Sequence, residues 1–372
     1  MKSLITAFIA SLLWLSAAHA DDCLQQLAAS TFSDADAACL RKLYSGPSQQ
    51  WPKPAVDADI AWQELAPLPQ RAPSPASNPF SSEKARLGEK LFFDPRLSRS
   101  GQIACASCHE PDLAFADGRK VSFGHNRAAG RRNAPSIVTS GLVTPLFWDG
   151  RAATLEDQAL MPVVDPLEMA FTREELVTRL RGLAEYPPLF TSAFAQGPLD
   201  AGQIAAALAT YQRTLVQKAR NTPFERFLRG RHDQLNDQQL HGLHLYRTKA
   251  RCLNCHFGPA MSDGQFHNAG MTYYGRKYQD LGRYEQTGLS EDSGRFRTPS
   301  LRLVGRTGPW IHNGLFPDLM GVLNFYNVGM PRPKPQPGQE NDPLFPRTSE
   351  RLKPLALNRS ELLALRAFLD TL

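Results

Sequence analysis

Apolar residues recur at the three- and four-residue spacing of an amphipathic helix in four parts of the chain. The first predicted helix begins at Ser81 or Ser82, either of which can cap it, and stops near Pro95. In the last one, Asn358 and Glu361 stand at the spacing of a capping box. The four apolar faces consist of Leu87, Leu91 and Phe92; Ile204, Ala207, Leu208, Tyr211 and Leu215, within 203–217; Leu240 and Leu243, after Asn236; and Leu362, Leu365, Phe368, Leu369 and Leu372.

Two long stretches, 117–135 and 264–298, are rich in Gly, Arg and Asn and lack the alternation of a strand. The stretch 45–78 is rich in Pro, Ala and Gln, which indicates an extended connector. The pattern therefore predicts a mainly α protein with long loops and little strand.

The first twenty residues have the pattern of a secretory signal. Lys2 precedes an apolar run over 4–15, and a small-residue site follows at Ala18-His19-Ala20. The run is too short to span a bilayer, and no later stretch approaches the required length. We therefore expect an exported, periplasmic protein without a membrane span.

The formal charge of +6 is spread along the chain rather than gathered in runs. This distribution argues against nucleic acid as a partner and only weakly for acidic partners.

Cys105-Ala106-Ser107-Cys108-His109 and Cys252-Leu253-Asn254-Cys255-His256 both match CxxCH, the attachment signature of c-type haem. In each, the two cysteines bond the haem and the histidine ligates its iron. A redox CxxC pair, half of a zinc site and chance are the alternatives, but none of them requires a histidine directly after both pairs. The sequence thus predicts two covalently bound haem c groups.

Together the motifs and the helices predict two cytochrome-c-like haem domains. The expected division is a signal peptide over 1–20, a Cys-containing segment and connector over 21–78, a first haem domain over 79–221 and a second haem domain over 222–372. No longer repeat is visible beyond the two motifs. The remaining cysteines, Cys23 and Cys39, are expected to form a disulfide in an oxidising compartment, with two free thiols as the alternative.

From about 87 to 372 the chain resembles the bacterial di-haem cytochrome c peroxidases and their MauG-type relatives. The resemblance is carried by Leu91-Phe92-Phe93-Asp94-Pro95-Arg96-Leu97-Ser98, ahead of the first motif, and by Phe147-Trp148-Asp149-Gly150-Arg151-Ala152. It implies that the His109 haem binds hydrogen peroxide and that Trp148, read alone a buried core residue, relays electrons between the haems.

The resemblance also places Gln158, Pro162 and Glu168 in the distal pocket of the His109 haem, with Glu168 as the acid/base. A carboxylate in an apolar pocket can take a proton from one peroxide oxygen and return it to the other. His125 matches a loop histidine that ligates the peroxidatic iron of the resting enzyme in many relatives. Read alone, Glu168 would be a solvated loop residue and His125 a surface one.

The sixth ligand of the His256 haem is a methionine in the peroxidases and a tyrosine in the MauG-type proteins, and here that position is Tyr326. Tyrosinate favours oxidised iron, whereas methionine raises the potential. Met330 is the rival ligand. The resemblance also places a calcium ion at Asn133, Thr307 and Pro309, where hard oxygen donors would suit it and ordinary loop structure is the alternative.

The leading hypothesis is a peroxidase that reduces hydrogen peroxide at the His109 haem, with electrons from a small cytochrome c or cupredoxin. The second is a MauG-type enzyme that uses peroxide to oxidise side chains of a partner protein, which Tyr326 favours and His125 disfavours. The third is a two-haem electron carrier without turnover, in which Gln158 and Glu168 would have no purpose. The sequence does not fix the oligomeric state, so a homodimer remains one of the alternatives.

Overall fold

A computed structural model describes residues 32–194 and 197–372. The predicted signal segment and Cys23 lie outside the described residues. The helices are α2 (Asp34–Leu43), α3 (Ser82–Phe93), α4 (Leu155–Ala159), α5 (Met161–Val164), α6 (Arg173–Gly182), α7 (Tyr186–Ala193), α8 (Ala201–Thr214), α9 (Pro223–Leu228), α10 (Asp237–Arg247), α11 (Tyr284–Thr287), α12 (Leu319–Asn327) and α13 (Arg359–Leu369).

The prediction of a mainly α fold with little strand is confirmed. Over the described ranges the strands are β1 (Phe266–His267) and β2 (Phe296–Arg297), which form one antiparallel pair. None of the helices in those ranges combines the length and apolar character needed to cross a bilayer.

The four predicted helices form at α3, α8, α10 and α13. Ser81 caps α3, Asn236 caps α10, and Asn358 caps α13 in the predicted capping box with Glu361. The helix predicted over 203–217 begins earlier and ends earlier: Asp200 caps α8, and after Thr214 the chain tightens into a 3₁₀ helix, Leu215–Ala219.

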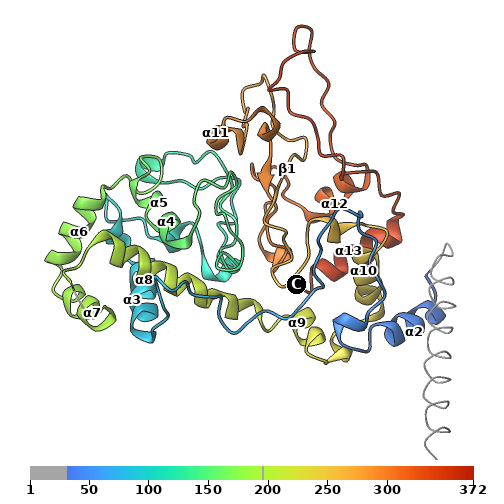
Figure 1. Ribbon diagram of the computed structural model, residues 1–372, viewed down its shortest axis with the longest axis horizontal. Coiled ribbons are helices and arrows are strands. Elements are labelled where there is room, and N and C mark those ends of the chain that lie inside the picture. The colour runs from blue at the N-terminus through green and yellow to red at the C-terminus, as the bar shows by residue number, and fades with distance from the viewer. Residues whose placement is uncertain (1–31, 195–196) are drawn as a thin grey trace, which may run out of the picture.

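Two hydrophobic clusters divide the described chain into two lobes, seen side by side in Figure 1. We call the N-terminal lobe the part built on α3 and α6 to α8, and the C-terminal lobe the part built on α9, α10, α12 and α13. Long loops of both lobes face each other across the middle of the molecule (Figure 1). The exact domain boundaries given above stay a prediction.

Each lobe is built on two helices that cross at a glycine. In the N-terminal lobe Gly88 of α3 faces Ala207 of α8, and in the C-terminal lobe Gly242 of α10 faces Ala364 of α13. A Cβ atom at either glycine would collide with the carbonyl oxygen of the facing alanine. Only a residue without a side chain lets the two backbones approach so closely.

The aromatic residues beside these crossings also correspond. Tyr211, one turn after Ala207, lies 5.3 Å from the Phe92 ring, and Phe368, one turn after Ala364, lies 5.3 Å from the Tyr246 ring. The two lobes therefore repeat one helix crossing, which the sequence did not reveal because only the glycines and the apolar spacing are shared.

Residues 32–78, which we call the strap, pack mainly on the C-terminal lobe. Tyr44 and Trp51 belong to its hydrophobic cluster, and the buried Arg247 guanidinium donates to Glu64 and to the Pro52 carbonyl, both at 2.6 Å. Cys39 of α2 is disulfide-bonded. The segment predicted to be a connector is thus the outer layer of this lobe for much of its length.

Replacing Gly242 with Ala should destabilise the protein by about 1–3 kcal/mol, because the added methyl overpacks the crossing of α10 and α13. The thermal unfolding midpoint of the haem-loaded protein measures this loss. Gly182→Ala is the matched control, since a Cβ there meets nothing within 4 Å. Equal midpoints for the two variants would contradict the steric account.

Candidate active site

The two CxxCH motifs form the same turn. A short 3₁₀ helix covers Cys105–Ser107 in the first and Cys252–Asn254 in the second. The backbone N–H of His109 donates to the carbonyl of the first cysteine at 3.0 Å, and that of His256 does so at 2.8 Å. Each turn brings two thiols and an imidazole to one side of the chain.

Both motif histidines are held in one tautomer. Nδ1 of His109 lies 3.1 Å from the Phe115 carbonyl oxygen, and Nδ1 of His256 lies 3.1 Å from that of Met261. Because a carbonyl only accepts, Nδ1 carries the proton and Nε2 keeps a lone pair for a metal. Phe115 and Met261 both have left-handed backbones, with φ of 58° and 51°. The same backbone conformation therefore directs the carbonyl of each residue at its motif histidine.

The four motif thiols are not bonded to one another. Burial, with the neighbouring cysteine of each pair adding to it, raises the pKa of the Cys105 and Cys252 thiols to about 12. Thiols that stay protonated are poor redox nucleophiles and poor zinc ligands without a charge partner. They do fit thioether bonds to a haem, which need no thiolate in the finished protein.

A single cavity of about 630 Å³ runs between the lobes and reaches both motifs. Most residues singled out in the sequence line it. These are Cys105, Cys108, His109, Asn133, Trp148, Gln158, Pro162, Glu168, Cys252, Cys255, His256, Thr307, Pro309 and Tyr326.

Glu168 and Gln158 come to the first motif from neighbouring elements. Gln158 lies on α4, which Thr154 caps, and Glu168 lies in the loop after α5, where its N–H donates to the Asp165 carbonyl at 3.1 Å. Burial, with Asp165 adding to it, raises the pKa of the Glu168 carboxyl to about 6. Its charge is also one of the causes that raise the pKa of Cys105, after burial and Cys108. A carboxyl whose pKa lies this close to neutrality can both accept and donate a proton.

His125 lies at the tip of a hairpin that packs onto the Glu168 segment. Its backbone N–H donates to the Glu168 carbonyl at 2.7 Å. Its Nδ1 is buried and has no hydrogen-bond partner among the described residues. Gly124 allows the contact, because a Cβ there would collide with the Leu167 carbonyl oxygen and come within 2.5 Å of the Glu168 Cα. His125 itself is absent from the cavity lining.

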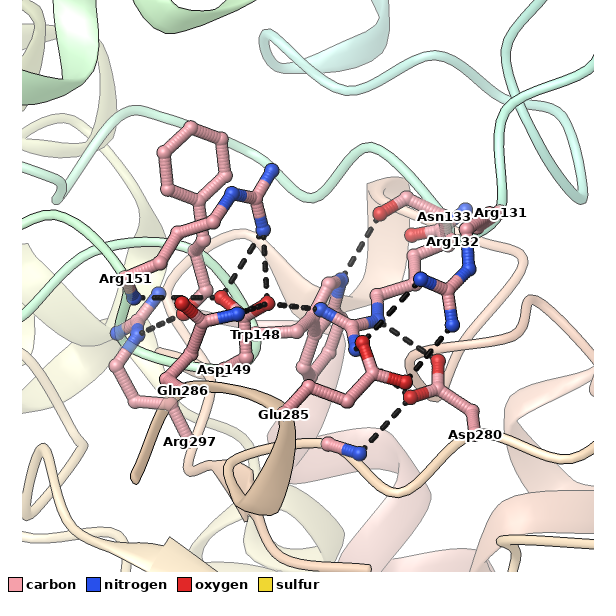
Figure 2. A network of polar contacts seen from close by, with 12 residues as sticks. Arg131, Arg132, Asn133, Trp148, Asp149, Arg151, Asp280, Glu285, Gln286 and Arg297 are labelled. Atoms are coloured by element: carbon pink, nitrogen blue, oxygen red, sulfur yellow. Dashed lines mark hydrogen bonds and ion pairs between the residues drawn. The ribbon is translucent and has the colours of Figure 1, made fainter. Parts of the chain in front are cut away.

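Trp148 is fixed at the junction of the lobes. Its indole N–H donates to the Asn133 carbonyl at 2.9 Å, and its own carbonyl accepts from the Arg297 N–H at 2.8 Å (Figure 2). The ring meets His312 edge-on with 6.3 Å between centroids, and His312 stacks on Phe296 at 3.6 Å. Residues of both lobes thus hold the indole in one orientation.

An ion network that sequence reasoning missed surrounds Trp148. Arg132 bridges Asp149 of the N-terminal lobe, at 2.5 Å, and Asp280 of the C-terminal lobe, at 2.7 Å (Figure 2). Arg131 and Arg132 also pair with Glu285. Asp149 also pairs with Arg151, at 3.0 Å, within the motif that contains Trp148, but Arg132 and Asp280 lie too far away in the chain for a local pattern to indicate the network.

Tyr326 and Met330 have different surroundings. Tyr326, on α12, lines the cavity beside the second motif, where burial and the nearby sulfurs of Cys255 and Cys252 raise the pKa of its phenol. Met330 follows the end of α12, has a left-handed φ of 62° and is 4% exposed within the apolar cluster of the lobe. Because α12 ends at Asn327, Met330 does not continue the helix that carries Tyr326.

Asp263 and His267 stand beside the second motif, with their side chains 2.8 Å apart. With Cys255 they bring three metal-ligating atoms within 4.8 Å of one another. Because Cys255 belongs to the second CxxCH motif, where a haem is expected, Asp263 and His267 are interpreted as an ion pair beside that motif.

A family model described as di-haem cytochrome c peroxidase matches residues 82–233. Methylamine utilization protein MauG of Methylorubrum extorquens is 37% identical over 324 residues, which cover 85% of this chain and 87% of that protein. The chain belongs to the di-haem cytochrome c peroxidase and MauG family. It is therefore a haem-dependent peroxidase with two covalently bound c-type haems.

Two further members of the family support this assignment. The cytochrome-c peroxidase IdrP1 of Denitromonas iodatirespirans is 35% identical over 345 residues, covering 86% of this chain and 88% of that protein. Among solved structures, a MauG-like protein associated with microbial copper homeostasis matches with a TM-score of 0.71 and 32% identity, covering 85% of this chain and 95% of that one.

Gly124→Ala should lower the rate constant for reaction with peroxide by about 100-fold, because the methyl pushes the hairpin off the Glu168 segment by an ångström or so. Stopped-flow mixing with peroxide measures the rate, and the absorption spectrum checks that both haems are attached. Gly130→Ala in the same hairpin is the control, since its Cβ comes no closer than 3.4 Å to any atom. A Gly124→Ala protein as fast as this control would disprove the contact's importance.

Proposed function

We propose that this di-haem peroxidase reduces hydrogen peroxide at the His109 haem. The observation that carries the proposal is that Glu168, Gln158 and the first motif share one lining, with the carboxyl mostly buried. In the overall reaction one peroxide takes up two electrons and two protons and gives two waters. When bound, the haems supply the redox-active iron for the two electron transfers.

The side chains of the first site handle the protons. Glu168 takes the proton from the peroxide oxygen nearer the iron and returns it to the departing oxygen, which leaves as water. Gln158, at the same wall, donates a hydrogen bond from its amide and holds peroxide in line with the carboxyl. Leu167, Met169 and Pro162 line the rest of this wall and keep bulk water away from the carboxyl.

Trp148 connects the first site to the second one. Because its indole N–H is bonded to a neutral carbonyl rather than to a carboxylate, no strong base stands ready to take that proton. Trp148 can therefore pass electrons without losing its proton. The electrons come from a small donor protein, a cytochrome c or a cupredoxin, through the His256 haem.

A MauG-type activity, in which peroxide is used to oxidise side chains of a partner protein, is the second candidate. Tyr326 favours it, since the phenol lines the cavity at the second motif and Met330 is packed in the core. A tyrosinate ligand disfavours a stored electron on that haem. His125 argues the other way, because a histidine closing the first site calls for reductive activation.

The remaining assignments also stand as proposals. The predicted signal segment supports a periplasmic location. Asn133, Thr307 and Pro309 share the cavity wall, and because the Asn133 amide nitrogen donates to the Arg119 carbonyl at 2.8 Å, its side-chain oxygen is the atom proposed to bind calcium. His125 is proposed as the closing ligand of the first haem on the strength of the family motif and of its backbone bond to the Glu168 carbonyl, and this role requires the hairpin to turn its ring into the cavity, whose lining lacks it here.

Glu168→Gln should slow the peroxide reaction by about 10²–10⁴-fold, because the amide cannot take the proton. Both haems should remain attached, as judged from the reduced absorption spectrum. Glu174→Gln, an exposed change on α6, provides the control and should react like the parent protein. Undiminished turnover in Glu168→Gln would remove Glu168 from the mechanism.

Replacing Tyr326 with Met should raise the midpoint potential of the His256 haem, since methionine favours reduced iron. Met330→Leu should leave that potential unchanged, and a shift in this variant instead would make Met330 the ligand. Peroxide added to the fully oxidised parent protein then separates the two functions. A spectral change of both haems without prior reduction supports the MauG-type activity, whereas reaction only after partial reduction supports the peroxidase.

A further inference from the structure

Several arginines line the cavity. Seven line it, and six of these are ion-paired within the described residues. The exception is Arg297, on β2, for which no carboxylate of the described chain lies within ion-pair distance. The six paired residues are Arg131, Arg132, Arg151, Arg251, Arg302 and Arg351.

The surroundings of Arg297 leave most of its guanidinium free. Its Nε donates to the Phe147 carbonyl at 3.2 Å, which leaves its four terminal N–H groups without a protein acceptor among the described residues. Asp263 is the acidic residue whose charge acts on it, but that carboxylate already accepts from His267 at 2.8 Å and from the Gln265 N–H at 2.9 Å. In Figure 2 Arg297 lies at the end of the network away from Asp280.

A buried guanidinium without a counter-ion is costly. Burial lowers the pKa of Arg297 to about 10, which expresses that cost. Buried charges in proteins are normally paired, and a guanidinium matches a carboxylate with two parallel hydrogen bonds. The structure therefore calls for an anion that belongs in the cavity and is not part of the chain.

Each haem carries two propionate groups, which are carboxylates. We propose that Arg297 binds a propionate of the haem attached at Cys252 and Cys255. The chain position favours this haem, because Pro299, two residues on, provides a carbonyl that contacts the His256 ring. The backbone of Arg297 holds the Trp148 carbonyl at the same time, so one residue links the second haem with Trp148.

This role gives Arg297 control over the second haem's potential. A cation at a propionate stabilises the reduced haem, which carries one more negative charge than the oxidised haem. Removing the cation should therefore lower the potential. The inference rests on the two haems of the family and not on the peroxide reaction.

Arg297→Gln in the haem-loaded protein is expected to shift the ratio of oxidised to reduced His256 haem about tenfold toward oxidised at a given potential, equivalent to about 59 mV for one electron. A redox titration followed by absorption and electron paramagnetic resonance, without peroxide, measures both haems. Arg297→Lys keeps the charge and should stay near the parent potential. Arg283→Gln, a neighbouring arginine that pairs with Asp292 and does not line the cavity, is the control.

Three results would overturn the proposal. Arg297→Gln could titrate like Arg283→Gln, Arg297→Lys could shift as far as Arg297→Gln, or the shift could fall on the His109 haem. If Arg297→Gln fails to mature, Arg297→Lys decides. Lysine lacks the planar fork, so the propionate bending mode in the resonance Raman spectrum should move while the potential holds. An unchanged Raman spectrum would then disprove the contact.

Discussion

The architecture depends on one steric constraint, the close approach of two helix backbones at a glycine. Gly88 and Gly242 have the same task in the two lobes, and each brings the helix that precedes a haem motif against the last helix of its lobe. Packing this tight leaves little freedom for repacking, because protein interiors are as dense as organic crystals. The haem turns that follow are therefore held at a defined distance from the core.

The two lobes differ in the side chains that surround this shared helix crossing. At equivalent places the N-terminal lobe has Phe92, whereas the C-terminal lobe has Tyr246, whose hydroxyl donates to the His256 carbonyl at 2.5 Å. The lining beside the first motif contains a carboxyl and an amide, and the lining beside the second contains a phenol. Between them the indole of Trp148 is held by groups from both lobes. The two lobes share one helix crossing but have different side chains beside their CxxCH motifs. This difference fits a division in which one site reacts with peroxide and the other transfers electrons.

Much of this could be predicted from local sequence. Caps and apolar spacing located α3, α10 and α13 because those signals act within one or two turns of chain. The CxxCH motifs located both haem sites because the chemistry requires adjacent residues. The contacts between the two lobes could not be predicted in this way. Arg132 meets Asp280, and Arg297 meets Trp148, only after the chain has folded across about 150 residues.

The resemblance to a family supplied what local patterns lacked, and it placed Glu168, Gln158 and Tyr326 at one cavity. It was less informative about Met330, because α12 ends at Asn327 and Gly329, with a left-handed φ of 86°, closes the helix before Met330 is reached. The strap was also missed as a packing layer. Its aromatic residues are scattered among prolines, and nothing local indicates which surface they cover.

The strap links the beginning of the described chain to its later half. Arg247 reaches Glu64 and Pro52 across 183 and 195 residues, so these contacts cannot form until most of the chain has been made. Contacts between distant residues are slow to form because a long loop must close first. The strap can therefore dock on the C-terminal lobe only after the first haem motif has been made.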